Sequence, residues 1–280
     1  MNHINDNVAI VILNYKSWED TIEEVNICKC VLNIDADNIV VIDNCSPNDS
    51  KERLKEKSVT DGFTFIEAED NKGYGAGNNI GLKYAFHKGY KYALILNNDI
   101  IINDSNMILE LLKIFKENDN IAVVNPDIYS PDGHLFNRDA IKPTLFDYTI
   151  GMLNYKRTGR KIKDFGGYSY VYRPQGCCMM VDLDKMNEID YFDEKTFLYC
   201  EEPILAERLL KRKYLCACNT KVSVIHNHSK TVKSTFDVEK IIKINNTSFS
   251  YYLEEYRRFN KLEIGICCFF NALKLRLLNG

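Results

Sequence analysis

Short apolar runs alternate with helical stretches over the first 130 residues. Five short runs are predicted to be strands: residues 8–13, 38–43, 63–67, 92–96 and 121–124. The first is continuously apolar, as expected of a strand that is covered on both faces. Stretches with helical spacing or helix-forming composition lie between them, at about 18–32, 49–57, 76–87 and 104–115. Repeated strand–helix units predict an α/β fold with a mostly parallel central sheet between two layers of helices.

The second half of the chain is less regular. Pro and Gly interrupt a polar stretch between Tyr129 and Tyr172, which is typical of a functional loop or lid. A strand is predicted at 175–181 and a helix at about 203–213, and the chain beyond His228 has one apolar helical face. We therefore expect a catalytic domain at residues 1–230 and a helical C-terminal extension at residues 231–280.

Composition narrows the class of protein. The chain has 280 residues, 36 Lys+Arg against 39 Asp+Glu, and 45% hydrophobic residues, as in an ordinary globular protein. A net charge of −3 provides no basic field, so no nucleic-acid partner is expected. The N-terminus is polar, and the apolar runs are too short for a signal peptide or a membrane span. These features predict a cytoplasmic protein.

The cysteines do not predict a disulfide framework. There are ten, in adjacent or near-adjacent pairs and two single positions, and no C-x-x-C spacing occurs. In a reducing compartment such residues serve mostly as small buried hydrophobes, and a zinc site is the weaker interpretation.

Polar residues follow three of the predicted strands. They are Asn14, then Asp43 and Asn44, then Asn97-Asn98-Asp99. Ligands bind outside the carboxyl ends of parallel strands, so a site is expected there, although such residues also end strands by forming turns. A carboxylate such as Asp99 beside amides suits Mg²⁺ or Mn²⁺, which bind through few carboxylates plus substrate phosphates.

The glycine-rich segment at residues 71–79 is not a dinucleotide fingerprint. It follows the third strand rather than the first, and Asn78 stands where the last glycine would be. Its glycines, Gly73, Gly75 and Gly77, allow a close approach of the backbone to a ligand, ahead of a helix N-terminus that favours anions.

Five stretches, taken in order, resemble the motifs of the family 2 glycosyltransferases of the GT-A fold, an inverting group that includes bacterial rhamnosyltransferases. They are residues 11–15, 41–46, 71–78, 94–99 and 192–202, with His226 downstream. The resemblance implies transfer of a sugar from a UDP- or dTDP-linked donor to a hydroxyl of a saccharide or lipid-linked saccharide. Synthesis of a cell-surface polysaccharide is the implied setting.

The resemblance also implies roles for the donor-binding residues. Asn14 and Asp43 match positions that line the nucleotide pocket, with Asp43 facing the pyrimidine base. Asn71, Gly75 and Asn78 match the loop around the nucleotide sugar.

The metal site implied by the resemblance is incomplete. Asn97-Asn98-Asp99 occupies the place of the family's D-x-D motif, so Asp99 is expected to meet Mn²⁺ or Mg²⁺ and the diphosphate. Asn97 replaces the first carboxylate, which implies a weaker metal site. His226 resembles a histidine that closes on the metal from the C-terminal side, although a structural histidine is the alternative.

The general base is where this sequence departs from the family. An acidic pair such as Glu-Asp commonly follows the aromatic-rich segment, and this chain has Glu201-Glu202-Pro203. Pro203 suits the first turn of a helix, which places the pair at its start. Glu202 is the predicted base by its matching place, and Glu201 is its substitute.

Alternatives remain for the C-terminus and for the function. Residues 257–280 carry five cations against Glu263 beside many apolar residues, so this segment is either an interfacial helix at the inner face of the membrane or a packing or dimerising helix.

A catalytically degenerate sugar-nucleotide-binding protein remains an alternative, because Asn97 and the Glu-Glu-Pro sequence differ from the acids of the family's motifs. A sugar nucleotidyltransferase is disfavoured, because the loop after the first strand lacks the glycine-rich basic sequence of that class.

Overall fold

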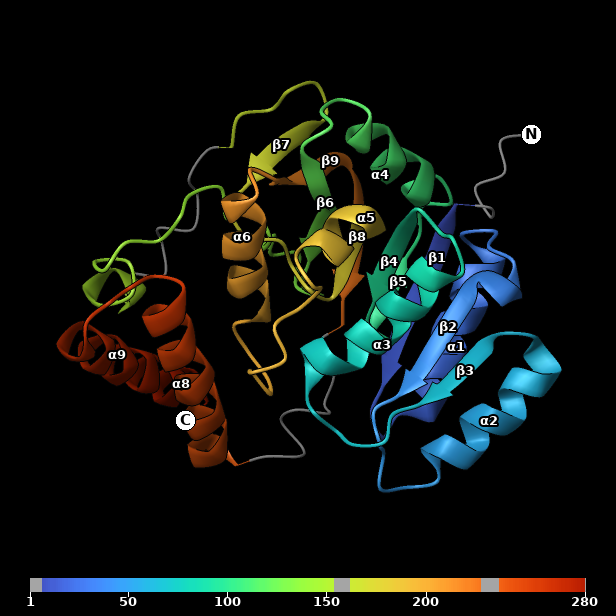
Figure 1. The fold of residues 1–280 in the computed structure, drawn as a ribbon, viewed down its shortest axis with the longest axis horizontal. Helices are drawn as coiled ribbons and strands as arrows, with labels where there is room; N and C mark the ends of the chain where they lie inside the picture. The colour runs from blue at the N-terminus through green and yellow to red at the C-terminus, as the bar shows by residue number, and fades with distance from the viewer. Residues whose placement is uncertain (1–6, 154–161, 228–236, 280) are drawn as a thin grey trace.

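The computed structural model describes residues 7–153, 162–227 and 237–279 (Figure 1). Its centre is a nine-stranded sheet in the order β3-β2-β1-β4-β8-β6-β9-β5, with β7 paired to β9. The strands are β1 (Val8–Asn14), β2 (Ile39–Asp43), β3 (Thr64–Glu67), β4 (Tyr92–Leu96), β5 (Ile100–Ile102), β6 (Ile121–Tyr129), β7 (Tyr168–Val171), β8 (Cys178–Asp182) and β9 (Leu215–His226).

Six of the nine strands run in one direction, as expected of a mostly parallel sheet, but four of the eight strand pairs are antiparallel. Strands β1 to β4 pair in parallel, and β6 and β9 run in the same direction as they do. Strands β5, β7 and β8 run the opposite way. Of the nine, β5, β7 and β9 are not predicted from the apolar pattern.

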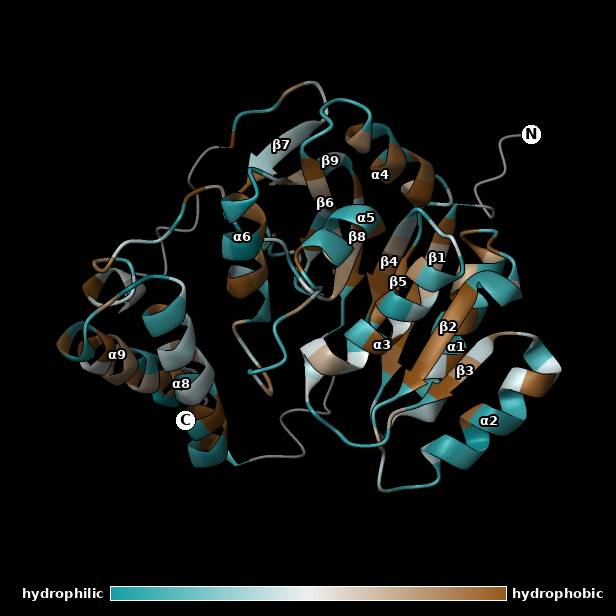
Figure 2. Ribbon diagram, viewed as in Figure 1, coloured by the Kyte–Doolittle hydropathy of each residue, from teal (hydrophilic) through white to brown (hydrophobic). Residues whose placement is uncertain are grey.

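Helices cover both faces of this sheet, which confirms the three-layer arrangement. Alternate residues of β1 belong to different cores: Val8, Ile10 and Ile12 pack on one side, and Ala9 and Val11 on the other. The first core includes residues of α1 (Trp18–Cys30), α2 (Ser50–Asp61) and α4 (Met107–Phe115), and the second includes residues of α3 (Tyr74–His87), α5 (Leu183–Glu188) and α6 (Glu201–Lys211). Figure 2 shows the central strands as largely hydrophobic and α2 as largely hydrophilic.

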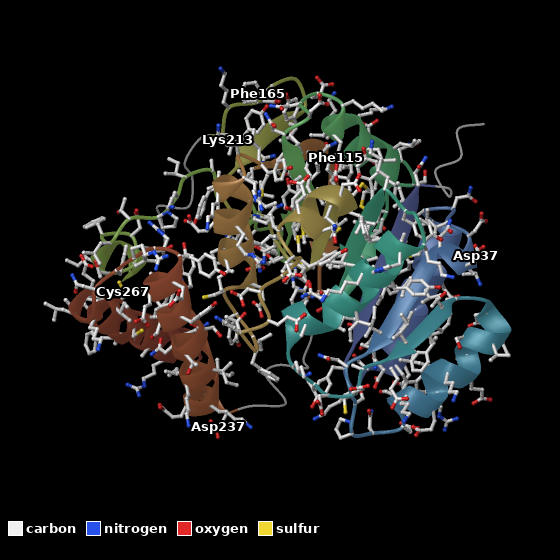
Figure 3. The ribbon with its side chains drawn as sticks, viewed as in Figure 1. Asp37, Phe115, Phe165, Lys213, Asp237 and Cys267 are labelled. Carbon is white, nitrogen blue, oxygen red and sulfur yellow. The ribbon has the colours of Figure 1, made fainter. Side chains whose placement is uncertain are left out.

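Two helices form the C-terminal part of the described chain. Helices α8 (Val238–Glu255) and α9 (Lys261–Asn279) pack against each other beside α6 (Figure 1). Asp237 caps α8, because its side chain accepts a hydrogen bond from the Lys240 N–H at 2.8 Å (Figure 3). A third core joins this pair to α6 through Ile204, Phe249 and Cys267. The predicted boundary between residues 230 and 231 lies outside the described residues.

Hydropathy gives no membrane span: in the described parts of the chain, every helix is too short or too polar to cross a bilayer.

The segment expected to be a loop or lid is anchored where it is described. It contains a short 3-10 helix, η2 (Ile150–Leu153), and β7. Tyr148, Tyr172 and Tyr252 form a tyrosine cluster, in which the Tyr252 hydroxyl lies 3.0 Å from that of Tyr148 and 2.9 Å from that of Tyr172. Arg257 donates to the hydroxyls of Tyr148 at 3.0 Å and Tyr252 at 3.1 Å. These contacts tie the segment to the C-terminal helices.

All ten cysteines are free, and six are buried. The prediction of small buried hydrophobes is thus confirmed for most of them. Within the described ranges, no group of three His, Cys, Asp or Glu side chains is placed to hold a metal ion.

Candidate active site

The ends of β1 and β2 carry the first pair of predicted site residues. Asn14 and Asp43 are partners in the parallel register, and both are fully buried. The Asn14 amide donates to Asp43 Oδ1 at 2.7 Å, and Ser46 donates to the same carboxylate through its N–H at 2.9 Å and its hydroxyl at 2.7 Å. The structure brings the two residues together, and the hydrogen bonds named here all join groups of the protein to one another.

Asn98 belongs to the same network. Its amide donates to the hydroxyls of Ser17 at 3.0 Å and Thr21 at 2.8 Å, and Thr21 donates in turn to Asn14 Oδ1 at 2.9 Å. Asn98 therefore joins the turn after β4 to the start of α1. The amide nitrogen of this middle residue of the Asn-Asn-Asp motif is thus committed to the scaffold.

Asp99 and His226 meet across an antiparallel strand pair. Ile100 at the start of β5 lies opposite His226 at the end of β9, and the imidazole Nε2 lies 3.2 Å from the Asp99 carboxylate. The two side chains are only 11% and 12% exposed. A carboxylate and an imidazole at this separation fit two ligands of a divalent cation whose remaining positions are filled by substrate oxygens.

A buried acid that was not predicted stands behind this pair. Glu24 on α1 is 2% exposed, and burial together with the charge of Asp99 raises its pKa to about 9. Glu24 is therefore protonated at neutral pH, which limits the negative charge around Asp99. No sequence signal singles it out, since Glu24 follows Glu19, Asp20 and Glu23 on one charged helix.

The glycines of the 71–79 segment approach other parts of the protein rather than open space. Gly73 has a φ of +101°, and a Cβ there would lie 1.9 Å from the carbonyl oxygen of Phe197. A Cβ on Gly75 would lie 3.2 Å from Phe192 Cβ, and one on Gly77 would lie 2.6 Å from a Leu13 methyl. At their Cβ positions these glycines therefore fit closely against the 192–197 segment and β1, and the approach of their backbone to a ligand stays a prediction.

Asn71 and Asn78 hold this segment in shape. Asn71 Oδ1 accepts from the Gly73 N–H at 3.0 Å and from the Asn44 amide at 3.2 Å. Asn78 is 1% exposed, and its amide donates to the Tyr74 carbonyl at 3.0 Å. Both residues therefore lie at the predicted loop, and these three hydrogen bonds are made within the protein.

The acidic pair begins α6 after an unusual backbone. Tyr199 and Cys200 have φ values of +72° and +66°, a left-handed conformation that is uncommon for residues other than glycine. Such conformations cluster at functional sites, because the surrounding structure must hold them in place. The turn brings Glu201 and Glu202 to the N-terminus of the helix, with Pro203 in its first turn as predicted.

The two acids have different surroundings. Glu202 Oε1 accepts hydrogen bonds from the Gly176 N–H at 3.0 Å and the Gln175 amide at 3.2 Å. Glu201 is 6% exposed, and burial together with the charge of Glu202 raises its pKa to about 8. Glu201 is thus largely protonated at neutral pH, whereas Glu202 is only half-buried. A proton acceptor must be reachable, so the geometry favours Glu202 as the base.

Gly176 and Cys177 connect the parts of the site. The Gly176 carbonyl accepts from the Tyr74 hydroxyl at 2.7 Å, so the same glycine contacts both the 71–79 segment and Glu202. The Cys177 carbonyl accepts from the Asn97 N–H at 2.8 Å, which ties the motif before Asp99 to the same place. These two residues were not predicted, because their role depends on backbone groups.

Arg173 is a further residue that sequence reasoning missed. It is half-buried and forms an ion pair with Asp139. Burial opposes its charge, but Asp139 and Glu202 outweigh that effect and raise the pKa of the guanidinium. A lasting positive charge near the candidate base is therefore part of the site.

The segment from Phe192 to Cys200 is held from both sides. On one side, Asn79 accepts from the Phe192 N–H at 3.0 Å and donates to its carbonyl at 3.0 Å. On the other, the hydroxyls of Tyr251 and Tyr256 donate to Asp193 Oδ2 at 2.6 and 2.5 Å. Helix α8 and helix α3 thus jointly fix the segment that leads into the acidic pair.

Comparison with known proteins gives concordant results. A family model described as Glycosyl transferase family 2 matches residues 9–183. The low-salt glycan biosynthesis hexosyltransferase Agl10 of Haloferax volcanii is 27% identical over 227 residues, which are 79% of this chain and 67% of that protein.

Two solved structures are similar in fold. The mannosyltransferase PcManGT from Pyrobaculum calidifontis, in complex with GDP-Man and Mn²⁺, has a TM-score of 0.60 at 12% identity over 96% of this chain and 69% of that one. S. aureus TarS 1–349, in complex with UDP-GlcNAc, has a TM-score of 0.58 at 12% identity over 94% of this chain and 70% of that one. At these identities the likeness shows the GT-A fold alone.

Proposed function

This chain belongs to glycosyl transferase family 2, and on that premise we propose that it moves a sugar from a UDP- or dTDP-linked donor to a hydroxyl of a saccharide or lipid-linked saccharide. The transfer is a single displacement that inverts the anomeric centre. The similarity to a glycan biosynthesis hexosyltransferase supports a role in making a cell-surface glycan. The single observation that carries the proposal is a reachable carboxylate, Glu202, held beside the 71–79 segment through Gly176.

Glu202 is the proposed general base. It takes the proton from the acceptor hydroxyl as that oxygen attacks the sugar, a contribution of about 10²–10⁴-fold to the rate. Both hydrogen bonds from Gly176 and Gln175 go to Oε1, and in the described chain none is made to Oε2. Oε2 is therefore the proposed proton acceptor. Glu201 remains the substitute, with its raised pKa as the argument against it.

Asp99 and His226 are the proposed ligands of Mn²⁺ or Mg²⁺. When bound, the cation would neutralise the charge that gathers on the departing diphosphate. The complex of the structurally similar mannosyltransferase with Mn²⁺ supports this choice of cofactor. Asn97 brings no carboxylate, so the proposed site depends on the substrate for its other oxygens.

The donor is proposed to lie along the ends of β1, β2 and β4. Asn14 and Asp43 would face the nucleotide, Asn71, Gly75 and Asn78 the sugar, and Asn97 and Asn98 the diphosphate side. The support is positional: Asn14, Asp43 and Asn97 stand at or next to the carboxyl ends of these strands, and Asn71 and Asn78 flank the start of α3, whose N-terminus attracts negative charge.

A donor screen tests the function. Purified protein is incubated with UDP- and dTDP-sugars, with and without Mn²⁺, with water or an added saccharide as the hydroxyl acceptor, and release of nucleotide diphosphate is measured. We expect release with at least one donor, stimulated by Mn²⁺ and lost in Glu202→Gln. Donor binding without release would instead support a catalytically degenerate binding protein, and use of a nucleoside triphosphate with release of pyrophosphate would support a nucleotidyltransferase.

The proposed place of action is the inner face of the cell membrane, reached by peripheral contact through the C-terminal segment. A homodimer through the same segment is the alternative. Helix α9 belongs to this segment, and its exposed residues include large apolar side chains.

A further inference from the structure

Asn125 is a buried polar residue that holds a turn next to the candidate active site. It lies on β6, is 1% exposed, and stands where the backbone pairing of β6 with β8 ends (Figure 1). The Asn125 amide donates to the carbonyls of Gln175 at 2.7 Å and Cys178 at 2.5 Å, and its Oδ1 accepts from the Gln175 N–H at 3.3 Å. These hydrogen bonds join both ends of residues 175–178, which we call the 175–178 turn, to β6.

A proline explains why a side chain is needed at this place. Val124 of β6 lies opposite Met180 of β8. Continued by two residues, this register would place Pro126 opposite Cys178, and proline has no N–H to donate to the Cys178 carbonyl. The Asn125 amide supplies the donor instead. Because an asparagine amide has two donor hydrogens and an oxygen acceptor, it can serve two carbonyls and one N–H at once.

The turn that Asn125 holds carries the hydrogen-bond donors of the proposed base. Glu202 Oε1 accepts from the Gly176 N–H at 3.0 Å and from the Gln175 side-chain amide at 3.2 Å. A Cβ on Gly176 would lie only 3.2 Å from Glu202 Oε1, so the turn and the carboxylate already fit closely. The orientation of this carboxylate, and with it the direction of Oε2, therefore depends on where the turn lies.

The same turn contacts the donor side of the site. The Gly176 carbonyl accepts from the Tyr74 hydroxyl at 2.7 Å, and the Cys177 carbonyl accepts from the Asn97 N–H at 2.8 Å. Tyr74 begins α3 and Asn97 follows β4, so the turn joins these two elements to the start of α6. It therefore helps to set the separation between the base and the elements that are proposed to bind the donor.

We propose that Asn125 is a positioning residue for sugar transfer, which holds the 175–178 turn so that Glu202 Oε2 points at the acceptor hydroxyl; this role rests on the proposed function. A misplacement of about 1 Å in a reacting group can lower a rate by about a hundredfold. The donor-binding residues keep hydrogen bonds of their own, such as that between Asn14 and Asp43. Loss of the Asn125 side chain should therefore lower kcat and leave donor affinity nearly unchanged.

A purely structural role is the alternative, because any buried amide with satisfied hydrogen bonds stabilises a fold. Asn219 on β9 provides a matched comparison, since it is fully buried and also bonds to backbone groups. Its amide donates to the Glu110 carbonyl of α4 at 2.9 Å, and its Oδ1 accepts from the Lys221 N–H of its own strand at 2.8 Å. Helix α4 covers the face of the sheet opposite to α6. The two asparagines are thus alike in burial and differ in what they hold.

Kinetics of nucleotide diphosphate release by the full chain, with the UDP- or dTDP-sugar that the donor screen identifies, test the proposal. Asn125→Ala should lower kcat by about 10- to 100-fold, with the donor Kd within about threefold by calorimetry. Asn125→Asp keeps the shape of the side chain but has at most one donor hydrogen, so it should also lower kcat while disturbing the fold less. Asn219→Ala should lower the Tm as Asn125→Ala does but keep kcat within about twofold. Equal losses of kcat in Asn125→Ala and Asn219→Ala would overturn the proposal.

A double variant shows whether Asn125 acts through Glu202. Residues that act as a unit have non-additive effects on a rate. In the Glu202→Gln background, adding Asn125→Ala should lower the residual release by less than about threefold. A further loss as large as that in the wild-type background would show that Asn125 acts elsewhere, and would overturn the positioning role.

Hydrogen exchange of the 175–178 turn gives a measurement that is independent of catalysis. Its amides should exchange faster by about tenfold or more in Asn125→Ala, and at the wild-type rate in Asn219→Ala. Unchanged exchange in Asn125→Ala would contradict the proposal. If the wild-type protein turns over no donor, the proposed function is wrong and the positioning role falls with it. If the wild-type protein is active and Asn125→Ala is equally active, only the role of Asn125 is wrong.

Discussion

His226 lies 3.2 Å from the carboxylate of Asp99 although 127 residues separate them along the chain. The contact depends on the antiparallel pairing of β5 with β9, which sets Ile100 opposite His226. The Asn227 N–H also donates to the Asp99 carbonyl at 2.9 Å, which fixes the two ends of the pair. A shift in the register of β9 would therefore separate the two proposed metal ligands.

Replacing Asp99 by Asn should weaken the response to metal. The variant keeps the shape of the side chain but loses the charge that attracts a divalent cation. The Mn²⁺ concentration for half-maximal nucleotide diphosphate release should rise at least about tenfold. Asp70→Asn, which removes an exposed carboxylate paired with Lys72, serves as the control and should have no effect. Unchanged metal dependence in Asp99→Asn would remove Asp99 from the site.

Replacing Glu202 by Gln should stop transfer while sparing the donor. Glutamine preserves hydrogen bonding but cannot accept the acceptor proton, so kcat should fall by about 10²–10⁴-fold. The dissociation constant of the donor, measured by calorimetry, should stay within about threefold, since a base acts on the acceptor. If Glu201→Gln produced this loss and Glu202→Gln did not, the two roles would be exchanged.

Glu201 should make the protein less stable as pH rises. Its pKa is raised from 4.5 to about 8 by burial and by Glu202, so the folded state holds a proton that the unfolded state releases. This contribution is fully present below about pH 4.5 and is lost as the pH rises through 8, at about 1.4 kcal/mol per unit between these values.

Urea unfolding at pH 6 and pH 8 measures this effect. The wild-type protein should lose roughly 2 kcal/mol more than Glu201→Gln over this interval. Glu24 has a raised pKa and acts with the same sign, but it is present in both proteins and cancels in the comparison. If the free energy of unfolding changed by the same amount in both proteins between pH 6 and pH 8, Glu201 would be ionised in the folded state.

Gly73→Ala should destabilise the fold far more than Gly89→Ala. Both glycines have positive φ, +101° and +87°, but a Cβ at Gly73 would collide with the Phe197 carbonyl, whereas one at Gly89 meets nothing within 4 Å. We expect a loss of about 3 kcal/mol or more for the first and about 1 kcal/mol for the second. Similar midpoints in thermal unfolding would contradict the close approach of the two segments.

Asp193→Asn should loosen the segment that carries the acidic pair. The Asp193 carboxylate accepts from Tyr251 and Tyr256, and hydrogen bonds to a charged group are the stronger kind. Urea unfolding should show a loss of roughly 2 kcal/mol. Because the segment leads to Glu202, kcat should fall more than donor affinity. The double variant Tyr251→Phe with Tyr256→Phe removes the two hydrogen-bond donors and should lower kcat in the same way. If kcat were normal in both variants, Asp193 would contribute to the stability of the fold and not to the position of Glu202.

The sequence predicted the elements whose burial is uniform. Strand β2 reads as a continuous apolar run because both faces are covered, and its five residues are all buried. Strand β9 was missed because Asn219, Thr220 and Lys221 interrupt it, and its pairing with β6 shifts register there. Its place in the sheet is determined by neighbours on both sides, which the local pattern does not contain.

The candidate site divides in a similar way. Asp99 and Glu202 were predicted because each stands in a motif that can be recognised from the sequence alone. Gly176, Arg173 and Glu24 were missed because they matter through a backbone N–H, a distant ion pair and the burial of one acid among four. The close approach of Phe197 to Gly73 was not predicted, because the sequence does not show which distant segment packs against a glycine.

The third core has a practical consequence for anyone who shortens this protein. Ile204 on the catalytic side is 1% exposed because Phe249 and Leu253 cover it. A version that stops before residue 237 would expose this residue together with Tyr148 and Tyr172, and we expect it to aggregate during purification. Substituting single outward-facing residues of α9 therefore probes the last helices more safely than deleting them.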